Sequence, residues 1–251
     1  MEVHAHSSPA PGGAHTARKK WTHYLWEFLM LFLAVFCGFL AEYQLEHKIE
    51  KDRERIYMKN MLEDLRSDTA LYKNYAIATT FALGSIDSLI YLLKSSERKS
   101  NANRIYFLAR IFTMRSDLLF PTDRTYEEMK SSGYLRLIRY QRISDSVSYY
   151  YNSLKQINNQ NERITDRMNH YFLSMNKLFD AEVLLKITKE RKEPEGTSTK
   201  LLTDDPLVIN ELLTRAQYLY ATFTFTQNLA LERYKKADNL IGLIEKEYHL
   251  K

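Results

Sequence analysis

The strongest pattern in the chain is an apolar run near the N-terminus. From Tyr24 to Tyr43 there are 20 residues, and Glu27 is the only charge before Ala41. A helix of that length extends about 30 Å, which matches the hydrocarbon core of a bilayer. Aromatic residues at both ends, Trp21 among them, are typical of membrane interfaces. The pattern predicts a transmembrane helix over residues 21–43.

Two cleavable alternatives fit this run less well. A signal peptidase prefers small residues at −3 and −1, and a cut after Ala41 places Phe39 at −3. A lipoprotein signal needs a small residue before its cysteine, whereas Phe36 precedes Cys37. We therefore expect an uncleaved anchor.

Three further segments place apolar residues three and four positions apart for about five repeats, a pattern typical of long helices that pack at a shallow angle. The first stripe comprises Met58, Met61, Leu62, Leu65, Thr69, Tyr72, Ala76, Leu83, Ile86, Ile90 and Leu93. The second comprises Ile143, Val147, Tyr150, Leu154, Ile157, Asn161, Ile164, Met168, Tyr171, Met175 and Leu178. The third comprises Ile209, Leu212, Ala216, Leu219, Phe223, Thr226, Ala230, Tyr234, Ala237, Ile241 and Ile244.

Polar segments separate these stripes. A short helix is expected over residues 104–113, and a second one, capped by Thr122 or Asp123, is expected to end at Gly133. Residues 189–205 are predicted to form a mobile loop, after which Asp205 and Pro206 begin the last helix as N-cap and first helical residue.

The predicted class is all-α, because glycine (7) and proline (5) are scarce and sheets need both for their turns. Leu45, Ile49 and Ile56 keep the helical phase beyond the span. We therefore expect the transmembrane helix to continue into an antiparallel bundle of three to four long helices with short connecting helices. The expected organisation is a disordered basic tail (1–20), the transmembrane helix (21–43) and a helical-bundle domain (44–251).

The charge pattern argues against nucleic-acid binding. The net charge of +5 arises from 36 basic and 31 acidic residues that are closely interleaved, whereas a nucleic-acid binder gathers its Lys and Arg on one stripe or tail. Cys37 is the only cysteine, so no disulfide can form within the chain.

The sequence predicts no catalytic, cofactor or metal site, and we expect no enzymatic activity. Glu42, Glu46, His47 and Glu50 share one stretch of helix, but a di-iron bundle needs a second Glu-x-x-His pair that the long helices lack. Phosphate-binding glycine loops, a Gly-x-Ser-x-Gly elbow and His-Glu-x-x-His are absent from the sequence.

Glu27 is the one candidate functional residue. A carboxylate inside a span commonly faces a partner or a pathway. The alternative is that Glu27 is accommodated near the helix N-terminus, where the helix dipole favours an anion. The sequence leaves both interpretations open and marks Glu27 as a possible intramembrane partner contact.

The segments 61–68 (MLEDLRSD) and 125–138 (TYEEMKSSGYLRLI), together with the glutamate-bearing span, resemble a family of single-span membrane proteins of unknown function from Bacteroidota. The resemblance covers about residues 20–180. The family often has glycine before the membrane glutamate, where this chain has Trp26. The resemblance implies an inner-membrane protein with an extracytoplasmic helical domain, and it transfers no catalytic residue.

The functional expectation is a non-enzymatic interaction or scaffold subunit of an inner-membrane complex. Its partners would be the lipid bilayer and a protein partner, or a second copy, contacted through the heptad faces. The alternative is an extracytoplasmic sensory module that binds a small ligand and signals through a partner. Arg18, Lys19 and Lys20 precede the span, so the positive-inside rule favours a cytoplasmic tail and a periplasmic bundle.

Overall fold

The computed structural model describes residues 17–114, 118–196 and 199–250, and the side chains of residue 21 onward within these ranges. Of the predicted tail, residues 1–20, the first sixteen lie outside the described residues. The described chain is helical and contains no strand, which confirms the all-α class. It divides into two compact units, Met1–Arg53 and Glu54–Lys251.

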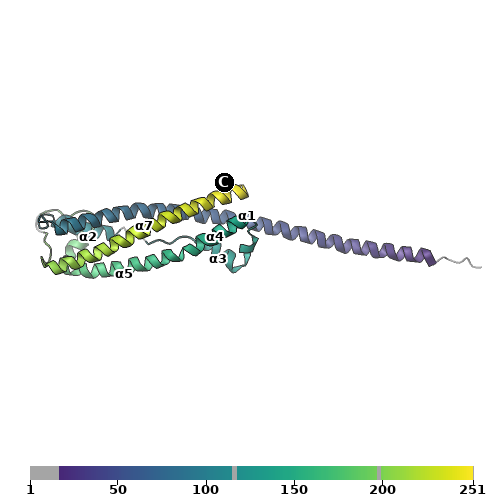
Figure 1. Ribbon diagram of the computed structural model, residues 1–251, viewed down its shortest axis with the longest axis horizontal. Helices are drawn as coiled ribbons and strands as arrows, with labels where there is room; N and C mark the ends of the chain where they lie inside the picture. Colours follow the sequence, from purple (N-terminus) through teal and green to yellow (C-terminus); the bar gives the residue numbers. More distant parts are fainter. Residues whose placement is uncertain (1–16, 115–117, 197–198, 251) are drawn as a thin grey trace, which may run out of the picture. The chain divides into compact units, whose positions relative to one another are not determined.

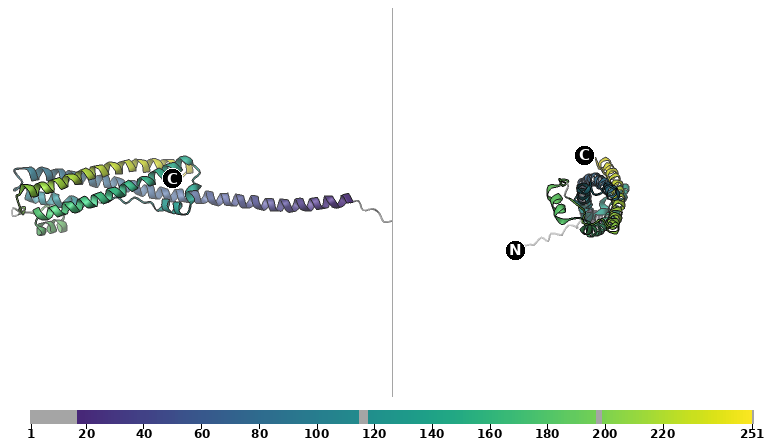
Figure 2. Two further views of the ribbon diagram at one scale, coloured as in Figure 1. Left: turned by 60° about the horizontal axis from the view of Figure 1, so that its bottom comes forward. Right: turned by 90° about the vertical axis from the view of Figure 1, so that its left-hand side faces the viewer.

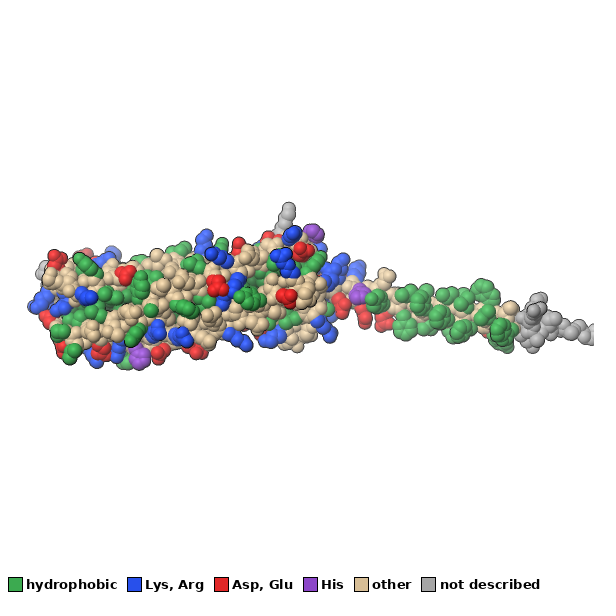
Figure 3. All heavy atoms as spheres, in the orientation of Figure 1, with side chains coloured by type: hydrophobic (Ala, Val, Ile, Leu, Met, Phe, Trp, Pro, Cys, Tyr) green, Lys and Arg blue, Asp and Glu red, His purple; other side chains and the backbone are tan. Residues whose placement is uncertain are grey.

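One helix, α1, runs from Ala17 to Lys94 and contributes residues to both units. In the first unit, the surface of the helix is exposed and carries mainly apolar side chains (Figure 3). Within the described residues, α1 contains the one segment that is long and apolar enough to cross a membrane, and none of that segment is buried by protein. The expected continuous helix is therefore present.

The second unit contains the remaining helices (Figure 1). They are α2 (Ala102–Ile111), the 3-10 helix η1 (Phe112–Met114), α3 (Arg124–Ser131), the 3-10 helix η2 (Tyr134–Leu137), α4 (Gln141–Ser153), α5 (Lys155–Leu178), α6 (Ala181–Glu190) and α7 (Pro206–Tyr248). Asp205 caps α7 by accepting a hydrogen bond from the Leu207 N–H at 2.8 Å, with Pro206 at the first helical position as predicted.

Contacts along the long helices define their directions. Arg66 of α1 pairs with Glu245 near the end of α7. Arg98, just after α1, pairs with Asp204, just before α7. Helix α7 is therefore antiparallel to α1. Tyr72 contacts Tyr150 of α4, and α5 continues toward Leu178, which joins the cluster that contains Leu93. α1 and α4–α5 therefore run in the same direction. Residues 118–123, which precede α3, lie along the bundle, where Leu119 bonds Asn161 of α5 and Thr122 bonds Asp68 of α1.

The second stripe of the sequence is buried throughout, but it is divided between two helices. α4 ends at Ser153 and α5 begins at Lys155, with Leu154 between them in a tight turn whose N–H bonds the Tyr151 carbonyl at 3.1 Å. The Tyr149–Tyr151 run divides as its helical position requires: Tyr149 is exposed, and the two tyrosines that follow are buried.

Helix α6 is an element that the sequence did not predict. Asp180 caps it by accepting hydrogen bonds from the N–H groups of Glu182 and Val183. It packs against α2, where the Arg110 Nε donates to the Thr188 hydroxyl at 3.0 Å. Figure 2 shows α6 outside the three long helices.

Two apolar clusters fill the bundle. One gathers around Met61, Tyr72 and Tyr150, and the other around Ile86, Tyr171 and Leu219. Buried polar residues lie between the two clusters along each long helix, among them Thr79 of α1, Gln160 and Asn161 of α5, and Thr226 of α7. The core of the second unit is therefore polar around its middle.

Candidate functional sites

In the candidate span, Glu27 lies on a helix face that otherwise carries small residues and a histidine. At about 100° per residue, His23, Glu27, Ala34, Gly38 and Ala41 lie within about 60° of arc on α1. The span's glycine and both of its alanines therefore share a face with its carboxylate. The large side chains of the span occupy most of the remaining circumference.

Glu27 has one neighbour of opposite potential charge. The Nε2 atom of His23, one turn earlier, lies 3.7 Å from the Glu27 Oε1 atom. The Cβ position of Gly38 has no other atom within 4 Å. Within the first unit this face is uncovered, so a second helix could approach its backbone closely.

In the bundle, three buried carboxylates project from α1 and bind the main chain of the segment around α3. Asp68 accepts hydrogen bonds from the Thr122 N–H at 2.7 Å and the Tyr150 hydroxyl at 2.6 Å. Asp64 accepts from the Thr125 N–H at 3.1 Å and the Thr125 hydroxyl at 2.5 Å. Both aspartates are at most 3 % exposed.

The predicted N-cap position of α3 is confirmed at Asp123, but the expected side-chain capping bond is absent. The Asp123 side chain accepts no hydrogen bond there, and the Thr122 N–H bonds Asp68. Asp64 takes over the capping role from another helix because its buried carboxylate reaches the first turn of α3. Gly133 does end this segment as predicted, with a φ of 74° that is readily adopted by glycine.

Glu54 fixes the far end of the same segment. Its carboxylate accepts hydrogen bonds from the Arg139 N–H at 2.8 Å and the Arg139 Nε at 2.5 Å, and also from the Tyr248 hydroxyl. The bond from the Thr125 N–H to Asp64 brings together the two sequence segments 61–68 and 125–138. Glu54, Asp64 and Asp68 have a structural role, and each of their carboxylate oxygens has a partner within the protein.

The electrostatics of Asp68 differ from those of an exposed carboxylate. Burial raises the pKa of Asp68 from its ordinary value of 3.8 to about 6, and the neighbouring Asp64 adds to the rise. Hydrogen bonds from Thr122 and Tyr150 oppose the shift. Burial also raises the pKa of Tyr72 and Tyr150, whose hydroxyls lie 3.1 Å apart, so both remain neutral donors at physiological pH.

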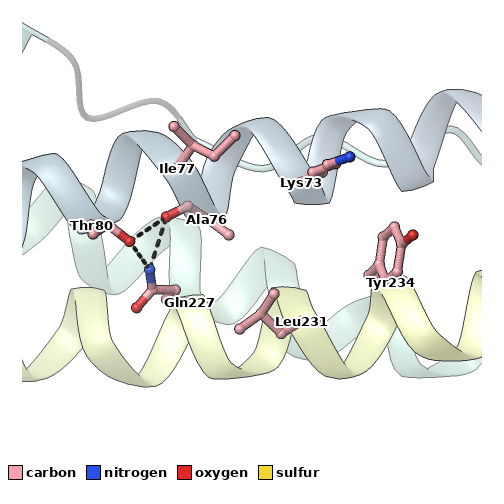
Figure 4. A pocket seen from close by; sticks show the side chains of 7 residues that line it. All are labelled: Lys73, Ala76, Ile77, Thr80, Gln227, Leu231 and Tyr234. Atoms are coloured by element: carbon pink, nitrogen blue, oxygen red, sulfur yellow. Dashed lines mark hydrogen bonds between the residues drawn. The ribbon is translucent and has the colours of Figure 1, made fainter.

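A groove of about 430 Å³ runs between α1 and α7 (Figure 4). It is lined by Lys73, Ala76, Ile77, Thr80, Gln227, Leu231 and Tyr234. The Gln227 amide donates to the Ala76 carbonyl and to the Thr80 hydroxyl, both at 2.8 Å, and so joins the two helices. The groove carries one amine and no carboxylate, so it has no pair of groups for acid–base chemistry.

The acidic stretch after the span does not assemble into a site. The His47 Nδ1 atom lies 3.6 Å from the Glu50 Oε2 atom on the same exposed helix surface. Among the described residues, no three His, Cys, Asp or Glu side chains come close enough together to hold a metal ion.

Sequence reasoning identified Glu27 but missed the three buried acids of the bundle. The available signal was spacing: Asp68 falls between Leu65 and Tyr72 at the three- and four-residue intervals of a core stripe. Comparison with known proteins adds no assignment, because no family model, no curated protein and no solved structure matches this chain.

Proposed function

We propose that this protein is a membrane-anchored, non-enzymatic interaction subunit of a bacterial inner-membrane complex, with residues 21–43 in the bilayer and the bundle in the periplasm. The anchor would contact its partner within the membrane through the face that carries Glu27. The partner is a transmembrane helix, from another protein or from a second copy of this chain.

The shared face of Glu27, Ala34, Gly38 and Ala41 is the observation that carries this proposal. A charged side chain costs about 3 kcal/mol at the centre of a span on insertion scales and less near its end, where Glu27 lies, and a partner that supplies hydrogen bonds offsets that cost. Small residues allow two helix backbones to approach closely, which is how membrane helices gain packing contacts. One face thus combines a polar group that needs a partner with the space that a partner requires.

The test is co-purification of the tagged full-length chain from its native membranes in mild detergent. We expect stoichiometric capture of one defined membrane protein, or of an untagged second copy, by the wild-type chain. Gly38→Leu and Ala34→Leu keep the span apolar but block close approach, so capture should fall at least about tenfold. Phe36→Leu, on the opposite side of the helix, is the matched control and should capture normally.

The outcomes separate the proposal from its competitors. Equal capture by wild type, Gly38→Leu and Phe36→Leu would reject the proposed face. A monomeric chain that captures nothing would reject the interaction role. Glu27→Gln keeps the shape of the side chain without its charge, so a loss of capture in this variant would assign part of the contact to the carboxylate itself.

Small-ligand sensing is the second candidate function, and the groove between α1 and α7 is the feature in its favour. Its volume of about 430 Å³ falls within the range of small-molecule pockets, about 300–1,000 Å³. The groove is open along one side, whereas such pockets enclose most of their ligand. A metabolite that raises the melting temperature of the wild-type chain, but not of Ile77→Glu, would favour sensing.

Orientation is tested separately by a reporter fused after Lys251. Periplasmic alkaline phosphatase activity is the expected result. Fluorescence from a cytoplasmic reporter at the same position would place the bundle on the other side of the membrane.

A further inference from the structure

Two stretches of the bundle contain Lys and Arg without any acidic residue, 98–116 and 129–144. In the first, Arg98, Lys99 and Arg104 form ion pairs with Asp204 and Glu193, which lie outside the stretch. Residues 129–144 contain Lys130, Arg136, Arg139 and Arg142 and no acidic residue. The part of this stretch that extends from η2 to the start of α4, residues 134–142, is here named the basic tip. It carries three of these four positive charges on nine residues.

The fold holds the basic tip firmly while leaving its charges exposed. Ile138 is buried beneath it, and Arg139 is bound through its N–H and its Nε to the carboxylate of Glu54. The side chains of Arg136 and Arg142 are exposed, and neither guanidinium forms an ion pair with any described residue. Two positive charges therefore remain uncompensated on an ordered surface.

The carboxylate next to the basic tip is already engaged. Glu54 is 1 % exposed, and it accepts hydrogen bonds from Arg139 and from the Tyr248 hydroxyl. The rings of Tyr140 and Tyr248 meet edge to face at 5.2 Å and close the tip against the end of α7. The tip is thus located at the end of the bundle where Glu54 begins the second unit.

Chain length limits how far this end can be from a membrane. Ten residues of α1 lie between Tyr43, the end of the candidate span, and Glu54, so the helix rises about 17 Å from one to the other. The polar head-group layer occupies about 5–8 Å of that distance. The remainder is close to one Debye length, about 8–10 Å at physiological to moderate salt, so charges at this level respond to the surface potential.

We propose that the basic tip binds the anionic head groups of the phospholipid surface into which residues 21–43 insert. Guanidinium groups suit this role because they bind phosphate oxygens through two parallel hydrogen bonds. Each arginine near an anionic surface strengthens attachment about fivefold. The inference rests on the membrane anchoring of the proposed function, and it names the lipid class that the bundle contacts.

The test uses the full-length chain in lipid nanodiscs with a fluorophore attached near the tip. A Cys37→Ala background leaves one reactive cysteine when Gln141, an exposed tip residue, is replaced by cysteine. The probe's fluorescence is quenched by a lipid with a spin label on its head group. We compare discs of neutral phosphatidylcholine with discs that contain phosphatidylglycerol at about one third.

We expect quenching to be at least about twofold stronger in the anionic discs and to decline in high salt. The double variant Arg136→Gln/Arg142→Gln should lose the increase, and Lys186→Gln/Lys189→Gln, on exposed positions of α6, should keep it. Circular dichroism and melting temperature verify that both double variants fold as the parent does.

Three results would overturn the proposal. The first is equal quenching in neutral and anionic discs, and the second is an equal loss in both double variants. The third is an effect that inorganic phosphate reproduces in neutral discs, because that would indicate a site for free anions. Failure of the chain to remain in any disc without detergent would instead reject the membrane anchor, so the two failures are distinguishable.

Discussion

At the scale of single residues, the buried carboxylates of α1 act as structural ligands of the main chain. Asp64 and Asp68 bind N–H groups at the start of α3, and Glu54 binds the N–H of Arg139. Buried N–H groups without an acceptor cost about 1–3 kcal/mol each. These acids therefore allow an irregular segment to be buried against α1.

Removing one of these acceptors should destabilise the bundle strongly. Asp64→Ala leaves the Thr125 N–H and hydroxyl without their acceptor, and we expect a loss of about 2–4 kcal/mol in the free energy of unfolding. Glu63→Ala changes the exposed neighbour and should stay within about 0.5 kcal/mol of wild type. Urea unfolding of the full chain in nanodiscs measures both, and equal effects would contradict the assigned role.

Asp68 should give the bundle a pH dependence of unusual sign. Its folded-state pKa, about 6, lies above the ordinary value of 3.8, so the folded protein binds the proton more tightly than the unfolded chain does. Its contribution to stability is therefore fully present below about pH 3.8 and is lost as pH rises through about 6. The loss amounts to about 3 kcal/mol.

Asp68→Asn tests this directly, because asparagine keeps an acceptor for the Thr122 N–H but has no titrating proton. Between pH 4.5 and 6.5 the difference in unfolding free energy between variant and wild type should shift in favour of the variant as pH rises. A difference that stays constant over this range would show that Asp68 does not titrate there.

At the scale of elements, the spacing of buried residues explains both the successes and the misses of the sequence analysis. All eleven residues of the second stripe are buried, and its apolar spacing made the helices of that region predictable. On α1 the buried positions also include Asp68, Tyr75, Thr79, Ala82 and Leu89. The predicted stripe missed Asp68 because the tertiary hydrogen bonds that bury it are invisible in local sequence. It missed Tyr75, Ala82 and Leu89 because it continued through their neighbours Ala76, Leu83 and Ile90, which are half-buried.

The same limit applies to the short elements. The cap of α3 was assigned to Thr122 or Asp123 because capping is usually local, whereas Asp64 reaches it from another helix. Helix α6 was missed because its ten residues show too little periodicity on their own, and Ile187 is its one fully buried side chain. By contrast, Asp205 and Pro206 form a local start signal, and α7 begins there as predicted.

The phase of α1 predicts unequal effects of two similar substitutions. Ile86→Ala removes a fully buried side chain, so we expect a loss of about 2–4 kcal/mol in the free energy of unfolding. Ile77→Ala, at an exposed position of the same helix, should cost less than about 1 kcal/mol. Comparable losses measured by urea unfolding would mean that α1 packs through a different face.

At the scale of the whole molecule, the sequence predicts the helical class and the apolar span well, and the arrangement of the bundle less well. Apolar spacing indicates long helices but contains no information on their direction. α1 and α4–α5 are parallel, and residues 118–123 lie along the bundle before α3, where the Asn161 amide bonds both the N–H and the carbonyl of Leu119. This placement depends on buried polar pairs, which a hydrophobic pattern does not reveal.

The functional proposals depend on the residence of residues 21–43 in lipid. The most direct measurement is alkaline carbonate extraction of membranes from cells that express the full-length chain. We predict that the chain stays in the membrane pellet, and that Phe32→Lys/Phe36→Lys releases it because two charges at the centre of the span oppose insertion. Recovery of the unaltered chain in the soluble fraction would contradict the membrane anchor.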